Sequence, residues 1–189
     1  MLLLSLGMRR VTVYVLGVLL LVSACGSSDG GGDGAKGDGG EKMSYESVKS
    51  SVDDLVSKIL PELATTFKGE FPAVRGGFNE CGVGPQFQKY SVRGELHAAV
   101  EDDAKAAEMI RGVLADAGLD VTIDDDQTVV ATQGETRVVM GPAMGRPVGG
   151  VTILPLAIDS ECQTYNGSDA DAMREVPPND YGSPVTGTS

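Results

Sequence analysis

The sequence predicts an α+β fold: one antiparallel or mixed sheet with two helices packed on one face. Two segments, 44–67 and 101–117, repeat apolar residues at helical spacing. Six shorter segments are rich in β-branched residues and are bounded by Gly, Asp or Pro. After the second helical segment no further helix is available as a crossover, so the later strands must join the sheet in antiparallel or mixed fashion. The predicted order is α-β-β-α-β-β-β-β.

The first predicted helix covers 44–67. Ser44 suits the N-cap, because its hydroxyl oxygen can accept a hydrogen bond from a backbone N–H of the first turn. Pro61 is expected to kink the last turns or to end the regular helix early. The apolar residues recur at spacings of three and four and are expected to pack on the chain's own sheet: Val48, Val52, Leu55, Ile59 and Leu63.

Two strands are predicted before the second helix. The first covers 71–81 and is expected to be interrupted at Gly76 and Gly77, where a bulge would fit. The second covers 87–96 and alternates, so one set of side chains should face the core. That set is Gln88, Tyr90, Val92, Gly94 and Leu96.

The second helix, 101–117, has acidic residues at its start and Gly118 as a left-handed stop. Four strands are predicted after it, at 119–124, 128–132, 136–140 and 151–158. Short polar turns join the first three as hairpins, and the longer segment 141–150 joins the last. The globular domain is thus placed at 43–164, and the polar, Pro-bearing stretch 165–189 is expected to be a disordered tail.

The amino-terminal segment has the features of an export signal. Arg9 and Arg10 precede twelve mostly apolar residues, 11–22, a run too short to span a membrane. The run ends in Val-Ser-Ala-Cys, which resembles the lipobox of bacterial lipoproteins. In that family the cysteine receives a diacylglycerol and the signal peptidase cuts just before it. The resemblance implies a signal peptide over 1–24, beginning at Met1 or at Met8, and a lipidated Cys25.

The segment 25–42 is expected to be a flexible Gly/Ser/Asp linker behind the lipid anchor. The resemblance places the mature chain on the extracytoplasmic face of the cell membrane, held by its acyl chains, palmitate among them.

Cys81 and Cys162 remain once Cys25 is assigned to lipid. In an exported protein an even remainder predicts a disulfide between them. Free thiols and a metal site are the alternatives. A zinc site would need two further ligands, and the sequence holds a single histidine, His97.

Taken whole, the chain is similar to small exported lipoproteins of actinobacteria. The matching pieces are "FNECG", "DDAKAAEMIRGVLADAGLDV" and "AIDSEC". The resemblance implies a disulfide-bonded α+β domain on a lipid anchor and no particular activity. The chain departs from the pattern in lacking tryptophan and in its longer C-terminal segment.

Little in the sequence points to catalysis. The net charge of -12 argues against nucleic-acid binding. His97 would have to serve any Ser-His-Asp or Cys-His arrangement, and no Gly-x-Ser-x-Gly occurs. The run 124–126 is Asp-Asp-Asp, without the alternation of a calcium loop, so a solvated hairpin turn is expected and weak calcium contact is the alternative. We therefore predict no catalytic, cofactor-binding or metal-ligating residues, and no cofactor.

The sequence-based hypothesis is a binding or adaptor module that holds an envelope protein or a cell-wall component. Two alternatives stay open. One is an enzyme, or enzyme accessory, that acts on cell-wall polymers through paired carboxylates. The other is a structural surface protein without a specific ligand. The oligomeric state is left open.

Overall fold

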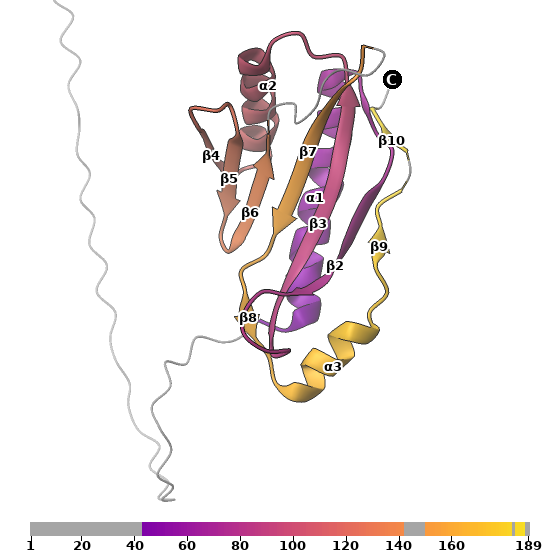
Figure 1. Ribbon diagram of the computed structural model, residues 1–189, viewed down its shortest axis with the longest axis vertical. Helices are drawn as coiled ribbons and strands as arrows, with labels where there is room; N and C mark the ends of the chain where they lie inside the picture. Colours follow the sequence, from indigo (N-terminus) through magenta and orange to yellow (C-terminus); the bar gives the residue numbers. More distant parts are fainter. Residues whose placement is uncertain (1–42, 142–149, 183, 188–189) are drawn as a thin grey trace, which may run out of the picture. The chain divides into compact units, whose positions relative to one another are not determined.

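The computed structural model describes residues 43–141, 150–182 and 184–187. The predicted signal peptide, Cys25, the linker and most of the loop at 141–150 lie outside these residues. The described chain forms three helices and a ten-stranded antiparallel sheet, which confirms the broad α+β class (Figure 1). The elements are α1 (Tyr45–Phe67), β1 (Glu70–Phe71), β2 (Val74–Glu80), β3 (Phe87–Ala98), α2 (Asp103–Asp116), β4 (Asp120–Ile123), β5 (Val129–Gln133), β6 (Thr136–Met140), β7 (Thr152–Asp159), β8 (Gln163–Thr164), α3 (Gly167–Glu175), β9 (Asn179–Asp180) and β10 (Val185–Thr186).

The sheet is organised around its two longest central strands. Its main path runs β10-β1-β3-β7-β6-β5-β4, with β2 and β8 also paired to β3, and β9 paired to β2. Strand β3 therefore has four partners, of which β7 shares eight consecutive register pairs with it. The observed order is longer than the predicted one, because β1, β8, α3, β9 and β10 are additional elements.

Helix α1 begins as predicted but does not end early. The Ser44 hydroxyl accepts a hydrogen bond from the Ser47 N–H at 3.2 Å. Pro61 lies inside the helix, which continues to Phe67, so the predicted early end is wrong. A proline removes one backbone donor, and the burial of the following turn, including Leu63 and Ala64, outweighs that loss.

Strand β2 runs straight through its two glycines. Seven consecutive pairs join it to β3, from Val74 opposite Gly94 to Glu80 opposite Gln88. The predicted interruption at Gly76 and Gly77 is wrong. The break falls instead at 72–73, between β1 and β2, where Pro72 has no N–H to donate to a ladder.

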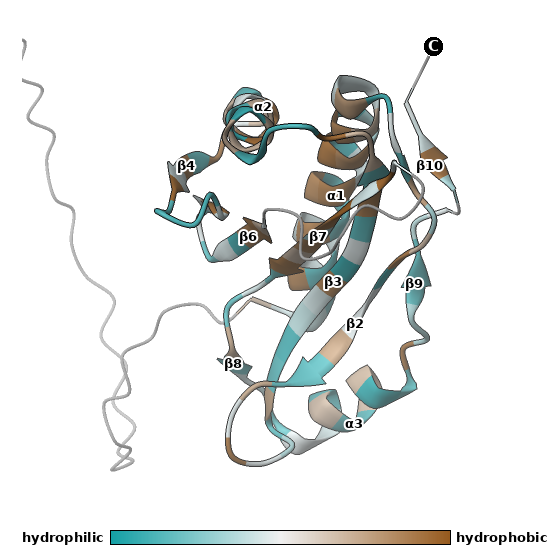
Figure 2. Ribbon diagram, turned by 45° about the horizontal axis from the view of Figure 1, so that its top comes forward, coloured by the Kyte–Doolittle hydropathy of each residue, from teal (hydrophilic) through white to brown (hydrophobic). Residues whose placement is uncertain are grey.

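The core lies on one face of the sheet. Helix α1 contacts β1, β3 and β10, helix α2 contacts β4 and β5, and the two helices contact each other. Figure 2 shows them side by side next to the strands. The alternation predicted for β3 is confirmed for Gln88, Tyr90, Val92 and Leu96, which are buried. Gly94 of the same set is half-buried, and Ser91 of the opposite set is buried as well. The matching buried residues of the neighbouring strands are Val129, Ala131, Val138, Met140, Leu154, Leu156 and Ile158.

The C-terminal segment is ordered wherever the structure describes it, and the predicted disordered tail is wrong there. Asn166 caps α3 by accepting from the Asp169 N–H at 2.9 Å, and the helix buries Ala170 and Met173. Farther on, β9 pairs with β2 and β10 pairs with β1. The segment has weak hydrophobic periodicity of its own, and it is held by partners distant in the sequence.

Candidate functional site

The candidate site lies on the sheet face opposite the core. In Figure 1, α1 lies behind β3 and β7, so these strands turn this face to the viewer. A concavity of about 780 Å³ covers part of it. Most of its lining is apolar or glycine, and five residues carry charged or titratable groups: Arg75, Arg93, Glu95, His97 and Asp126. Strands β2, β3, β6 and β7 and the β4–β5 turn contribute to the lining.

Two arginines stand opposite each other on this face. The β2–β3 register pairs Arg75 directly with Arg93, and both side chains are exposed. The Arg93 guanidinium donates to both Asp159 carboxylate oxygens, at 2.8 and 3.1 Å, and to the Val92 and Ile158 carbonyls, at 2.9 and 3.3 Å. Within the described residues Arg75 makes no ion pair. Arg93 is thus held in place by direct contacts, while Arg75 is not held by an ion pair with any described carboxylate.

Asp159 forms ion pairs with two neighbouring cations, Arg93 and Lys89. The Ser91 hydroxyl donates to its carboxylate at 2.6 Å, and the Lys89 ammonium lies 3.1 Å away. Burial opposes ionisation of Asp159, but the Ser91 hydrogen bond and the contacts from Arg93 and Lys89 outweigh it, so the pKa of Asp159 lies below its usual range. The group is therefore an anion at neutral pH, shared by two cations.

A second hollow adjoins the first. It has a volume of about 530 Å³ and shares Arg75 and Arg93 with the larger concavity. Lys89, Ser91 and Asn79 also line it, and its described lining contains no acidic side chain. Gly77 forms part of its floor, where an added Cβ would have no heavy atom within 4 Å. Two arginines thus stand between an apolar concavity and a cationic hollow.

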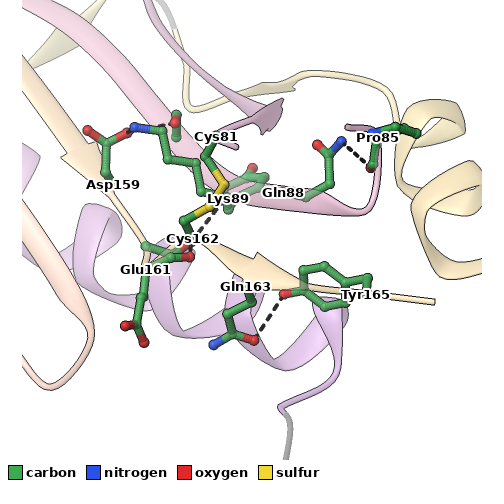
Figure 3. The surroundings of a disulfide bond; sticks show 12 residues. Cys81, Pro85, Gln88, Lys89, Asp159, Glu161, Cys162, Gln163 and Tyr165 are labelled. Atoms are coloured by element: carbon green, nitrogen blue, oxygen red, sulfur yellow. Dashed lines mark hydrogen bonds and ion pairs between the residues drawn. A yellow bond between two sulfur atoms is a disulfide. The ribbon is translucent and has the colours of Figure 1, made fainter. Parts of the chain in front are cut away.

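The predicted disulfide between Cys81 and Cys162 is present, with the two Cα atoms 5.8 Å apart. Cys81 follows β2, and Cys162 lies between β7 and β8. Figure 3 shows Lys89 extending past the disulfide toward Asp159. The bridge therefore fixes the end of the sheet beside the cationic hollow.

Two other sequence candidates, His97 and Asp126, line the larger concavity. The His97 Nε2 lies 3.7 Å from a Glu95 carboxylate oxygen. Asp124, Asp125 and Asp126 form the exposed β4–β5 turn, as predicted. The Thr128 N–H donates to Asp126 at 3.0 Å, and this hydrogen bond lowers the pKa of the Asp126 carboxyl. Among the residues that the structure describes, no group of three His, Cys, Asp or Glu side chains is placed to hold a metal ion.

A polar cluster that sequence reasoning missed lies on the core face. We call Lys49, Asp53, Tyr90 and Tyr181 the tyrosine clamp. Tyr181 donates to Asp53, Lys49 pairs with the same carboxylate, and the two tyrosine hydroxyls lie 3.2 Å apart. Burial raises the pKa of both tyrosines, so both hydroxyls stay protonated at neutral pH. The clamp ties the C-terminal segment to α1 and β3.

The arginine pair was also missed. Each arginine alone has the pattern of an ordinary exposed strand residue, and only the register brings them together. The one available signal was the alternation of 87–96, which put Arg93 on the solvent side.

Comparison with family models, with curated proteins and with solved structures gives no match for this chain. None of the helices that the structure describes is long and apolar enough to cross a membrane.

Proposed function

We propose that this chain is a membrane-anchored extracytoplasmic lipoprotein whose domain is a binding or adaptor module of the cell envelope. The concavity on the open sheet face is the observation that carries the proposal. Its volume of about 780 Å³, its mostly apolar lining and its few convergent polar groups are typical of ligand sites. Two helices packed on the opposite face would account for why this face is left free.

The proposed location rests on the amino-terminal sequence and on the cysteines. The apolar run before Cys25 has the length and the ending expected of a lipoprotein signal. A disulfide between Cys81 and Cys162 suits an oxidising compartment outside the cytoplasm. The acidic net charge is consistent with a domain that does not bind nucleic acid.

A carboxylate-dependent enzyme of cell-wall polymers is the second candidate, because Glu95 and Asp126 line the same concavity. Such an enzyme needs one carboxyl group that keeps its proton near neutral pH. The hydrogen bond from the Thr128 N–H lowers the pKa of Asp126, so Asp126 would be the ionised partner and the acid role would fall to Glu95. We prefer binding to catalysis because most of the surface of the concavity is apolar.

The test uses the full chain in its own cell envelope. A photo-crosslinking amino acid replaces Val139, which lines the concavity, or Ser57, an exposed residue of α1 that serves as the matched control. We expect a reproducible adduct with one envelope component from position 139 and none from position 57. Equal adducts at both positions, or none at 139, would favour a structural protein without a specific ligand.

The anchor is tested separately by Cys25→Ser. We expect this variant to leave the membrane fraction. Its continued retention there would contradict the lipoprotein assignment. Release of product from purified cell-wall fragments, lost in Glu95→Gln, would favour the enzyme instead.

A further inference from the structure

We propose that the two adjoining hollows bind a small amphiphile: an apolar body that carries one anionic group, a carboxylate or a phosphate. The anionic group lies between Arg75 and Arg93, and the apolar body lies along the larger concavity. This inference names the ligand class of the module proposed above, and it rests on that proposal only for the choice of sheet face.

The first step is the arginine pair. Like charges directly opposite each other on antiparallel strands destabilise a sheet. Arg75 and Arg93 occupy such a pair, and Lys89 lies on the same side of β3. Asp159 is the only acidic group in ion-pair contact with these three cations among the described residues, and it serves Arg93 and Lys89. Pairs of like charge such as this one reduce the stability of a fold, and they are expected mainly at functional sites.

The second step is the position of the other carboxylates. Glu95 is the next residue on the same face of β3, and Asp180 pairs with Arg75 in register. Neither forms an ion pair with Arg75. The Asp180 carboxylate accepts from the Gly182 N–H at 3.1 Å instead. Arg75 is therefore available to an external anion, on a chain whose net charge is -12.

The third step is donor geometry. A guanidinium group presents planar paired donors that match the oxygens of a carboxylate or a phosphate. The terminal amino groups of Arg93 already donate to Asp159 and to two backbone carbonyls, so its Nε–H is the donor that remains for a ligand. Among the described residues Arg75 makes no ion pair, so it can present its paired donors to the anion from the neighbouring strand. One available arginine beside one oriented arginine suits a single anionic group.

The fourth step is the apolar part. The walls continuous with the arginines are formed by Pro72, Ala73, Val139, Pro155 and Ala157. The volume of about 780 Å³ falls within the range that holds small ligands. The carboxylates Glu95 and Asp126 also line this concavity and would repel an anionic group there, so the ligand carries its single charge at the arginine end. An amphiphile uses both hollows at once.

The experiment titrates the full chain carrying Cys25→Ser, so that no attached acyl chain competes. The probes are octyl phosphate, octanoate, octanol and inorganic phosphate, followed by ¹H–¹⁵N correlation spectra. We expect octyl phosphate or octanoate to shift residues that line both hollows. Octanol and inorganic phosphate should each bind at least about tenfold more weakly, because each offers one half of the contacts.

The variants are Arg75→Gln and, as the matched control, Arg137→Gln. Arg137 is an exposed β6 arginine without an ion pair among the described residues, and it lines neither of the two hollows. Arg75→Gln should weaken binding of the anionic probe about tenfold or more, and Arg137→Gln less than about twofold. Arg75→Lys should recover part of the affinity. The spectra themselves report whether each variant is folded.

Equal affinity for octanol and octyl phosphate would overturn the inference, as would equal effects of the two glutamine variants. Binding to phosphatidylglycerol vesicles without binding to the soluble probes would also overturn it, in favour of a membrane surface. None of these results bears on release of Cys25→Ser from the membrane or on the adduct from position 139. Failure of this inference is therefore distinguishable from failure of the proposed function.

Discussion

Two adjacent glycines in β2 should respond in opposite ways to the same substitution. At Gly76, an added Cβ would lie 2.8 Å from the Tyr90 hydroxyl and 2.8 Å from the Tyr181 hydroxyl. At Gly77, it would meet nothing within 4 Å. Neither glycine has a positive φ, so alanine is compatible with the backbone at both positions.

The magnitudes follow from this contrast. Alanine in place of glycine in a strand gains about 0.5–1 kcal/mol, because the unfolded chain loses freedom. Gly77→Ala should therefore raise the free energy of unfolding by that amount. At Gly76 the gain is opposed by overpacking, which costs about 1–3 kcal/mol, and by loss of the hydrogen bond between the tyrosines, about 1 kcal/mol. Gly76→Ala should thus destabilise the fold by about 1–3 kcal/mol.

Urea unfolding and thermal unfolding, both followed by far-UV circular dichroism, measure the two variants. Their melting temperatures should differ by about 5 °C or more, at roughly 3 °C per kcal/mol for a domain of this size. The double variant Gly76→Ala with Tyr181→Phe should recover part of the loss, because one of the two crowding hydroxyls is removed. Coincident unfolding curves for the two single variants would refute the reasoning about the tyrosine clamp.

Three other predictions concern the C-terminal segment, Asp159 and the disulfide. Removal of residues 166–189 should lower the free energy of unfolding by about 3–5 kcal/mol, because buried Ala170, Met173 and the clamp are lost; an unchanged melting temperature would contradict this. The folded pKa of Asp159 lies below the unfolded value of about 4, so its carboxylate stabilises the fold above that pH and the contribution is lost as the pH falls through the folded pKa. Asp159→Asn should therefore be less stable at pH 7 and lose less on acidification to pH 3, and parallel stability profiles would argue against it. Cys162→Ser should cost up to about 4.5 kcal/mol, the chain-entropy value for a separation of 81 residues, and native Cys81 and Cys162 should resist alkylation until they are reduced.

Periodicity predicted the elements that carry their own amphipathic pattern. Helix α2, strands β3 to β7 and the turn at 124–126 lie within a residue or two of the predicted positions. Each of these segments alternates or repeats strongly enough that burial of one face follows from the local sequence. The disulfide followed from counting cysteines in a chain whose amino-terminal segment predicts export.

The C-terminal elements could not be predicted in this way. Strands β9 and β10 have two residues each, too few to show alternation. Helix α3 buries only Ala170 and Met173, and its mean hydropathy is low. The one local signal was Asn166, followed by Asp169 in the first turn, which is a common helix start.

The site depended on register. Arg75 and Arg93 become neighbours because the 81–86 connection fixes which residues of β2 and β3 face each other. Tyr181 and Tyr90 meet across 91 positions of sequence. Such contacts between distant residues have no signature in the pattern of either segment alone.

The disulfide also determines how the chain would respond to mechanical extension. Cys81 and Cys162 enclose β3, α2 and β4 to β7, whereas α1, β2 and the C-terminal elements lie outside the ring. Pulling the two ends of the described chain apart would unfold the outer elements, because only non-covalent contacts hold them. The enclosed residues would span about 270 Å if fully extended. Until the bond is reduced, none of this length could add to the distance between the two ends. Arg93 and most of the concave face lie within this inextensible part.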